Sequence, residues 1–210
     1  GTEIDIPADI SSAAFFMVGA SIAPGSDLIL EHVGLNPTRD GVITILRAMG
    51  ANIEVSQART VGGEPVADLR IRYAPLRGID IPVEEVPLAI DELPAILVAA
   101  ACAEGVTVLR GAEELRVKES DRIASMAEGL TQLGIGNTVA PDGITVVGGT
   151  PSGGVITTHH DHRIAMSFAM AALRASDPII VTDCAHVATS FPGFAELAAN
   201  TGLRLTVTAS

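Results

Sequence analysis

The chain has 210 residues, of which 48% are hydrophobic and 3% aromatic, so its core must be built mainly from Ala, Val, Ile and Leu. A formal net charge of -12 argues against a nucleic-acid or anionic-membrane partner, because either would require a basic surface. The longest apolar run, residues 96–103, is too short to span a bilayer, and no leader-like segment opens the chain. Cys102 and Cys184 form no CxxC pair, and we interpret both as buried, reduced thiols of a cytoplasmic protein.

A threefold internal repeat predicts an α/β domain with pseudo-threefold symmetry. Each copy begins with an aspartate that opens an Ala-rich helix and can cap its first turn. A short strand, a second helix with an apolar stripe, a glycine suited to a left-handed helix end and a closing strand follow. These features are, in chain order, Asp9, 27–33, Gly50 and 52–55; Asp91, 106–109, Gly134 and 137–139; Asp161, 179–182, Gly202 and 203–207.

The spacing within the repeat is regular, since the aspartate and the glycine lie 41, 43 and 41 residues apart in the three copies. Further strands fit between the copies, at residues 66–73 with 79–82 and at residues 143–147 with 154–158. Glycine-rich turns are expected at residues 62–65 and 148–153. Because no low-complexity linker divides the chain, we expect a single domain over residues 1–210.

The densest charge cluster is Leu115-Arg-Val-Lys-Glu-Ser-Asp-Arg122, which leads directly into the second helix of the middle copy. If that helix includes both Lys118 and Arg122, the two cations share one face at a helix start, where the helix dipole adds positive potential. This arrangement suits a phosphate or carboxylate, and Glu119 becomes a candidate proton shuttle if burial raises its proton affinity. The alternative is a solvated helix start with ordinary ion pairs.

The second charge cluster is His159-His160-Asp161-His162-Arg163. A metal site is disfavoured here because the repeat assigns Asp161 to capping, and because adjacent residues of a strand point to opposite faces. Arg163 follows a helix start and more plausibly contacts an anion. For His162, a catalytic role and a core or capping role remain open.

The repeat provides an internal control for these charges, because a residue that the fold requires should recur in every copy. The other two copies carry no equivalent of Lys118, Glu119, Arg122, His162 or Arg163 at matching positions. The scaffold therefore does not need them. Asp91 is different: capping is its default interpretation, and a base or orienting group for a substrate hydroxyl is the alternative.

Five segments of the chain form a distinctive set: Leu115–Arg122, Asp161-His-Arg-Ile-Ala-Met166, Thr189-Ser-Phe-Pro192, Asn36-Pro-Thr-Arg39 and Asp9-Ile-Ser-Ser12. Together they closely resemble the 5-enolpyruvylshikimate-3-phosphate synthase family, in its class II, glyphosate-insensitive branch. The resemblance runs from about Ile4 to Val207 and covers only the C-terminal half of the family's enzyme. It implies the second of two domains, each built from three βαβαββ units, with the active site between them.

The resemblance also implies roles in the transfer of an enolpyruvyl group from phosphoenolpyruvate to shikimate 3-phosphate. Asp91 is a candidate base at the attacking hydroxyl, Lys118 approaches the same hydroxyl, and Glu119 donates a proton to the enol methylene carbon. No metal or organic cofactor is implied.

Phosphoenolpyruvate itself would be held by Arg122 and Arg163, with His162 next to them. The chain carries Thr189-Ser190 where many class I members have a lysine before Phe-Pro, and Glu114 where class I has a substrate-binding asparagine.

Both substrates would be shared with a first domain absent from this chain, whose extreme N-terminal segment packs into the second domain in the family. We expect a monomer that is catalytically silent without that domain. The alternatives are a domain of the UDP-N-acetylglucosamine 1-carboxyvinyltransferase type and a non-catalytic anion-binding module.

Overall fold

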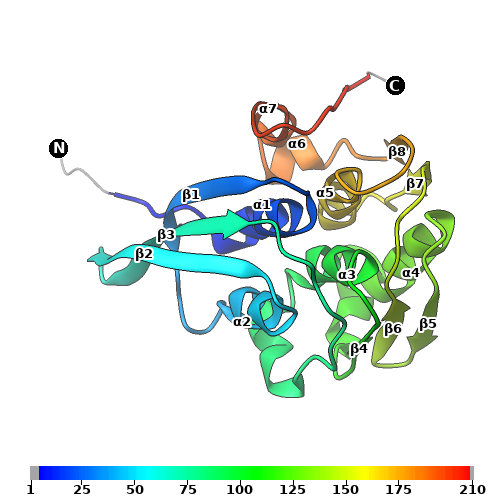
Figure 1. Ribbon diagram of the computed structural model, residues 1–210, viewed down its shortest axis with the longest axis horizontal. Helices are drawn as coiled ribbons and strands as arrows, with labels where there is room; N and C mark the ends of the chain where they lie inside the picture. Colours follow the sequence, from blue (N-terminus) through cyan, green and yellow to red (C-terminus); the bar gives the residue numbers. More distant parts are fainter. Residues whose placement is uncertain (1–4, 209–210) are drawn as a thin grey trace.

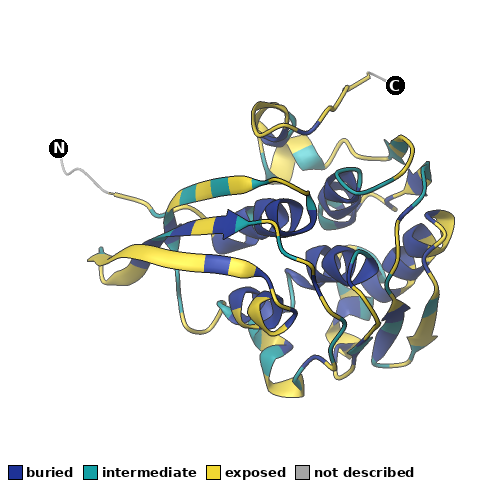
Figure 2. Ribbon diagram, viewed as in Figure 1, coloured by how far each residue is buried: buried dark blue, intermediate teal, exposed yellow. Residues whose placement is uncertain are grey.

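Three apolar helices form the centre of the molecule in the computed structural model, which describes residues 5–208. These are α1 (Ile10–Ile22), α3 (Leu93–Ala101) and α5 (His162–Ala171), the Ala-rich opening helices of the three copies. They contact one another, and most of their residues are buried (Figures 1 and 2). The domain expected over residues 1–210 includes residues 1–4 and 209–210, which lie outside the described part.

The first two copies each build a three-stranded antiparallel sheet whose last strand lies in the middle. The sheet orders are β1-β3-β2 and β4-β6-β5. The first copy contains β1 (Asp27–Gly34), α2 (Gly41–Ala48), β2 (Asn52–Val61) and β3 (Glu64–Arg72), and the second contains β4 (Val106–Leu109), α4 (Arg122–Gln132), β5 (Asn137–Ala140) and β6 (Gly143–Val147). Three short 3-10 helices lie in the connections: η1 (Val83–Glu85), η2 (Pro87–Ala89) and η3 (Glu113–Val117). The α/β class and the repeat order are confirmed.

The third copy is incomplete within the described residues. It contains β7 (Gly154–Thr157), β8 (Ile179–Thr182), α6 (Val187–Ser190) and α7 (Phe194–Asn200), and β7 pairs with β8 in parallel. The strand predicted at 203–207 does not form. In the other copies the closing strand pairs with a middle strand, and residues 5–208 contain no such strand for the third sheet.

Each copy also begins with an extended segment that runs parallel to the strand after its first helix. In the third copy this segment is β7, whereas in the other copies it is reduced to isolated bridges, Ala8 with Val33 and Asp80 with Val108. The strand expected at 79–82 is therefore wrong as a full strand. Pro82, which has no amide hydrogen to donate, ends the pairing.

The helix ends follow the predicted pattern at the glycines but not at every aspartate. Gly50, Gly134 and Gly202 adopt φ values of 96°, 73° and 107°, a left-handed conformation that glycine adopts at little cost. Asp9 accepts a hydrogen bond from the Ser12 amide at 2.9 Å, so it caps α1 as expected. The default interpretation of Asp91 as a cap is wrong, because Glu92 occupies the N-cap position of α3 and no side chain caps that helix.

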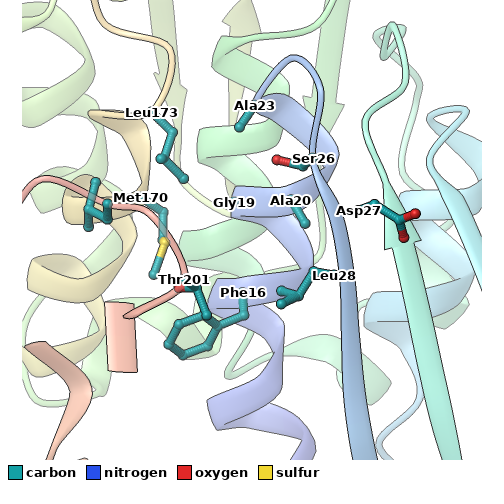
Figure 3. A pocket seen from close by; sticks show the side chains of 11 residues that line it. Phe16, Gly19, Ala20, Ala23, Ser26, Asp27, Leu28, Met170, Leu173 and Thr201 are labelled. Atoms are coloured by element: carbon teal, nitrogen blue, oxygen red, sulfur yellow. The ribbon is translucent and has the colours of Figure 1, made fainter. Parts of the chain in front are cut away.

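An apolar hollow lies beside α1 and α5 on the side of the incomplete third copy. Figure 3 shows Phe16, Gly19 and Ala20 of α1 opposite Met170 and Leu173, and Thr201 and Leu203 complete the lining after α7. No helix among residues 5–208 is both long and apolar enough to cross a membrane.

The two cysteines differ in environment. Cys102 is partly buried against the core, and this burial raises the pKa of its thiol to about 12, so the thiol stays protonated. The expectation of burial is wrong for Cys184, which is exposed in the loop after β8. Both are free thiols.

Candidate active site

The candidate site lies where the starts of α1, α3, α4 and α5 converge on the carboxylate of Asp91. Asp91 immediately precedes Glu92, the N-cap residue of α3, and its side chain is 31% exposed. Four cations surround this carboxylate, at closest N–O distances of 3.5 Å for Arg122, 3.7 Å for Arg163, 3.8 Å for Lys118 and 4.0 Å for Arg39. Cations that lie 27 to 72 residues from Asp91 in the sequence thus form a single concentration of positive charge around it.

The Arg122 guanidinium is the buried centre of this cluster, since its side chain is 1% exposed and that of Asp161 is fully buried. The Arg122 Nε atom donates to Asp161 Oδ2 at 2.8 Å, and the two terminal nitrogens face Asp91 and Glu119. A buried guanidinium requires such partners, because an unpaired charge in the interior is strongly unfavourable. The interpretation of Arg122 as part of a solvated helix start is therefore wrong.

Asp161 performs two structural tasks with its two carboxylate oxygens. Its Oδ1 accepts hydrogen bonds from the backbone amides of Arg163 and Ile164 and so caps α5, as the repeat predicted. Its Oδ2 accepts from Arg122 and from the Ser120 hydroxyl. Burial alone would raise the pKa of Asp161, but these hydrogen bonds and the Arg122 charge outweigh it and lower the pKa.

Lys118 and Glu119 precede α4 instead of lying on it. The helix begins at Arg122 and is capped by Asp121, so the condition that Lys118 and Arg122 share a helix face is not met. Lys118 ends the turn after η3 with an extended backbone and pairs with Glu114 as well as with Asp91. The Glu119 side chain pairs with Arg122 and is 51% exposed, so burial of this carboxyl in this chain is limited.

Arg163 and His162 occupy the first turn of α5. The Arg163 Nη1 atom donates to the backbone carbonyl of Asp91 at 3.0 Å, which ties α5 to the start of α3. Burial and then the Arg163 charge lower the pKa of His162, against the opposing charges of Asp161 and Glu119. The imidazole is therefore biased towards its neutral form beside the cations.

A small polar hollow opens next to these two residues. It is lined by the start of α1, by His162, Arg163 and Met166 of α5, and by Ser190 and Phe191. The Thr189-Ser-Phe-Pro192 segment, quoted for its resemblance, thus reaches the site through Ser190 and Phe191.

The other histidines of the second charge cluster have separate partners. His159 Nε2 lies 2.9 Å from Glu128, and the ring of His160 packs edge-on against that of His186. In residues 5–208 no group of three or more His, Cys, Asp or Glu side chains is placed to hold a metal ion.

Sequence reasoning missed Arg39, Ser11 and Glu92 as parts of this site. Arg39 and Ser11 stood only in segments quoted for the family resemblance, and Glu92 was not singled out, yet Arg39 lies 4.0 Å from Asp91 and Glu92 follows Asp91 at the start of α3. The available signal was the departure of Glu92 from the repeat, because a charged residue beside an opening aspartate has no counterpart after Asp9.

The geometry has a definite chemical capacity. Guanidinium and ammonium groups at helix starts can bind the carboxylate and phosphate of an anionic substrate. Carboxylates held among those cations can accept or deliver protons at the bound substrate.

Comparison with known proteins identifies the family. The model of the EPSP synthase (3-phosphoshikimate 1-carboxyvinyltransferase) family matches residues 1–197. The 3-phosphoshikimate 1-carboxyvinyltransferase of Alkalilimnicola ehrlichii is 67% identical over 98% of this chain and 46% of its own length. That of Methylococcus capsulatus is 66% identical over 98% of the chain and 47% of its own length.

The solved structures agree. EPSP synthase from Acinetobacter baumannii superposes with a TM-score of 0.97 at 56% identity, covering 100% of this chain and 49% of that one. The enolpyruvyl transferase NikO from Streptomyces tendae shares the fold, with a TM-score of 0.77 at 20% identity over 98% of this chain and 45% of that one. The chain spans about half the length of the curated relatives that it matches. The resemblance noted from the sequence is thus confirmed, and the chain belongs to the EPSP synthase family.

Proposed function

We propose that this chain forms the C-terminal half of an enzyme that transfers the enolpyruvyl group of phosphoenolpyruvate to the 5-hydroxyl of shikimate 3-phosphate, with release of phosphate. The observation that carries this proposal is the convergence of Lys118, Arg122 and Arg163 on Asp91, in a chain of this family. The two alternatives, a UDP-N-acetylglucosamine-specific domain and a non-catalytic module, are not favoured. The curated relatives described above are named 3-phosphoshikimate 1-carboxyvinyltransferase.

In the proposed reaction, the cations of the site first bind the anionic groups. Arg122 and Arg163 hold phosphoenolpyruvate, and His162, whose pKa is lowered by burial and by the Arg163 charge, lies beside them. Arg122 suits this task because Asp161 fixes its Nε atom, while its terminal nitrogens pair with the part-exposed carboxylates of Asp91 and Glu119. A preorganised guanidinium needs no reorganisation when charge develops on the substrate.

The proton transfers are assigned to the carboxylates. Glu119 donates a proton to the methylene carbon of phosphoenolpyruvate, which leaves an oxocarbenium-like centre at the neighbouring carbon. The 5-hydroxyl of shikimate 3-phosphate adds to that centre while Asp91 accepts its proton, and Lys118 orients the same hydroxyl. The deprotonated Glu119 carboxylate then takes a proton back from the new methyl carbon, the carbon–carbon double bond re-forms, and the bond to the phosphate oxygen breaks to release phosphate.

The remaining contacts are assigned to another half of the enzyme, since the relatives are about twice as long as this chain. We expect the two substrates to lie between the halves, in a cytoplasmic, monomeric protein without a metal or organic cofactor. We further expect the N-terminal segment of the other half to complete the third sheet, where β7 and β8 have no further partner among residues 5–208.

The test is to combine this chain with the complementary half and to measure phosphate release from the two substrates. We expect no release by the chain alone, release by the combination, and a loss of about 100-fold or more in Arg163→Ala. UDP-N-acetylglucosamine replaces shikimate 3-phosphate in the control reaction and should give no release. A folded complex of both halves that releases no phosphate would contradict the proposal.

A further inference from the structure

Glu92 is a buried carboxylate that the proposed reaction does not use. The residue is 2% exposed, at the start of α3 next to Asp91. Burial raises the pKa of Glu92, and the hydrogen bond from Ser11 and the charges of Arg163 and Arg39 oppose this. Within the described residues, the Glu92 carboxylate has one hydrogen-bond partner, the hydroxyl of Ser11 in the first turn of α1. A buried acid with a single hydroxyl partner is costly, so its presence beside the site needs a reason.

The Ser11 hydroxyl connects Glu92 to a cation. Ser11 is itself 3% exposed, and it donates to Glu92 while its oxygen accepts a hydrogen bond from Arg39 Nη2 at 2.8 Å. Because the hydroxyl has one hydrogen, donation to Glu92 leaves its lone pairs directed at Arg39. Glu92 thereby sets the orientation in which Ser11 can hold the guanidinium.

Arg39 occupies the loop between β1 and α2, and this loop is preset by a local turn. Asn36 Oδ1 accepts hydrogen bonds from the Thr38 amide at 3.0 Å and from its hydroxyl at 2.8 Å. The Arg39 side chain remains 47% exposed, so without an anchor it would sample many rotamers. The Nη2 atom that Ser11 holds also lies 4.0 Å from Asp91 Oδ2.

We propose that Glu92, Ser11 and Arg39 form a positioning relay, in which Glu92 orients Ser11, Ser11 anchors Arg39, and Arg39 holds the Asp91 carboxylate in place. The catalytic consequence rests on the proposed function, whereas the relay itself is a property of the fold. Of the four cations around Asp91, Arg39 is the farthest in sequence from the charge-dense segment 115–122. It lies in the β1–α2 loop and is anchored by Ser11 of α1.

The other charges around Asp91 show why a separate anchor matters. Lys118 is shared with Glu114, Arg122 with Asp161 and Glu119, and Arg163 with the Asp91 backbone carbonyl. Arg39 also faces Asp9, with its Nη1 atom 4.0 Å from Asp9 Oδ1. When substrate anions recruit Arg122 and Arg163, Arg39 remains as the cation that Ser11 fixes beside Asp91.

The kinetic test uses Ser11→Ala and Arg39→Gln in the full-length enzyme. The readout is the change in kcat compared with the change in KM for each substrate. We expect each to lower kcat about tenfold while KM for both substrates changes less than about threefold, because the relay orients a group without contacting substrate. Arg39→Lys, which keeps the charge, should recover part of the loss. Ser21→Ala is the matched control: it deletes a buried hydroxyl of the same helix that donates to the Met17 carbonyl, and it should leave kcat unchanged.

Glu92→Leu separates positioning from stability. Replacement of a buried charge by an apolar side chain is often neutral or stabilising, so we expect an unchanged or higher denaturation midpoint together with a lower kcat. Glu92→Gln keeps an acceptor for Ser11 and should retain most of kcat. Wild-type kcat in Ser11→Ala and Arg39→Gln would overturn the relay.

A second measurement does not depend on activity. The Nε–Hε resonance of Arg39, followed by NMR relaxation in arginine-labelled enzyme, should report an ordered side chain in the wild type and Ser21→Ala, and a mobile one in Ser11→Ala and Glu92→Leu. An Arg39 that is mobile in the wild type, or unaffected by Ser11→Ala, overturns the relay. If the wild-type enzyme releases no phosphate, the proposed function fails while this measurement still decides the relay.

Discussion

The starts of α3 and α5 occupy equivalent places in the repeat, and each has an aspartate, but the two carboxylates are used differently. Asp161 is fully buried and divides its oxygens between the α5 cap and Arg122. Asp91 is 31% exposed, caps nothing and faces four cations. Because no side chain caps α3, the Asp91 carboxylate is available to the cations around it, while Asp161 of the next copy holds one of those cations, Arg122, in place.

Of the substitutions that test this difference, we expect those at Asp161 to have the largest effect, a loss in the free energy of unfolding. Asp161→Ala removes the α5 cap and leaves the Arg122 guanidinium buried without its main partner, so we expect a loss of about 3–5 kcal/mol in the free energy of unfolding. Asp161→Asn keeps a capping oxygen and removes only the charge, and should lose less. Urea denaturation measures both, and equal losses in the two variants would contradict the division of labour between the oxygens.

The effect of Asp161→Asn on the pH dependence of stability follows from the direction in which folding shifts the Asp161 pKa. The pKa of Asp161 is lowered in the folded protein, so its ionised form contributes stability above the unfolded value, which is about 3.9. That contribution is lost as pH falls through the lower, folded pKa. Asp161→Asn should therefore unfold with a weaker dependence on pH in acid than the wild type.

At Asp91 we expect the opposite result: a substitution there should lower catalytic activity and leave stability nearly unchanged. Asp91→Asn should lower kcat for phosphate release at least about 100-fold in the full-length enzyme, the lower bound typical of a lost general base. Its free energy of unfolding should change by less than about 1 kcal/mol, since the ion pairs of this part-exposed carboxylate are weak.

Asp9→Ala is the matched comparison at the third equivalent position. It removes a working cap from α1 and should lose about 1 kcal/mol of stability. A larger loss of stability in Asp91→Asn than in Asp9→Ala would show that Asp91 is structural.

The sequence predicted those features that depend on local pattern. The central helices, the glycine ends and the first two sheets follow from periodicity and turn chemistry within each copy. The strand expected at 203–207 has the right composition, but a strand also needs a neighbour, and none is present among residues 5–208. Pairing is a property of the sheet and not of the segment.

The sequence predicted those site residues that have no equivalent in the other copies of the repeat. Lys118, Glu119, Arg122, His162 and Arg163 stood out because the other copies lack them, and the structure gathers all five around Asp91 or Arg122. Their catalytic and binding roles remain predictions.

The relay was not visible in the sequence. It joins α1, the β1–α2 loop and α3 through contacts between residues 28 and 81 positions apart. No local pattern encodes such contacts.

The smallest expected effect concerns His162, beside the α5 cap. Its pKa is lowered by burial and by Arg163, so the unfolded chain binds more protons than the folded chain as pH falls below the unfolded value of about 6.5. Stability should therefore fall between pH 7 and pH 5.5, by less than about 1 kcal/mol because the imidazole is part-exposed. His162→Gln should remove this slope, whereas His159→Gln, at an exposed histidine paired with Glu128, should retain it. Unfolding free energies measured across this range test the assignment, and an unchanged slope in His162→Gln would show that the acid sensitivity originates elsewhere.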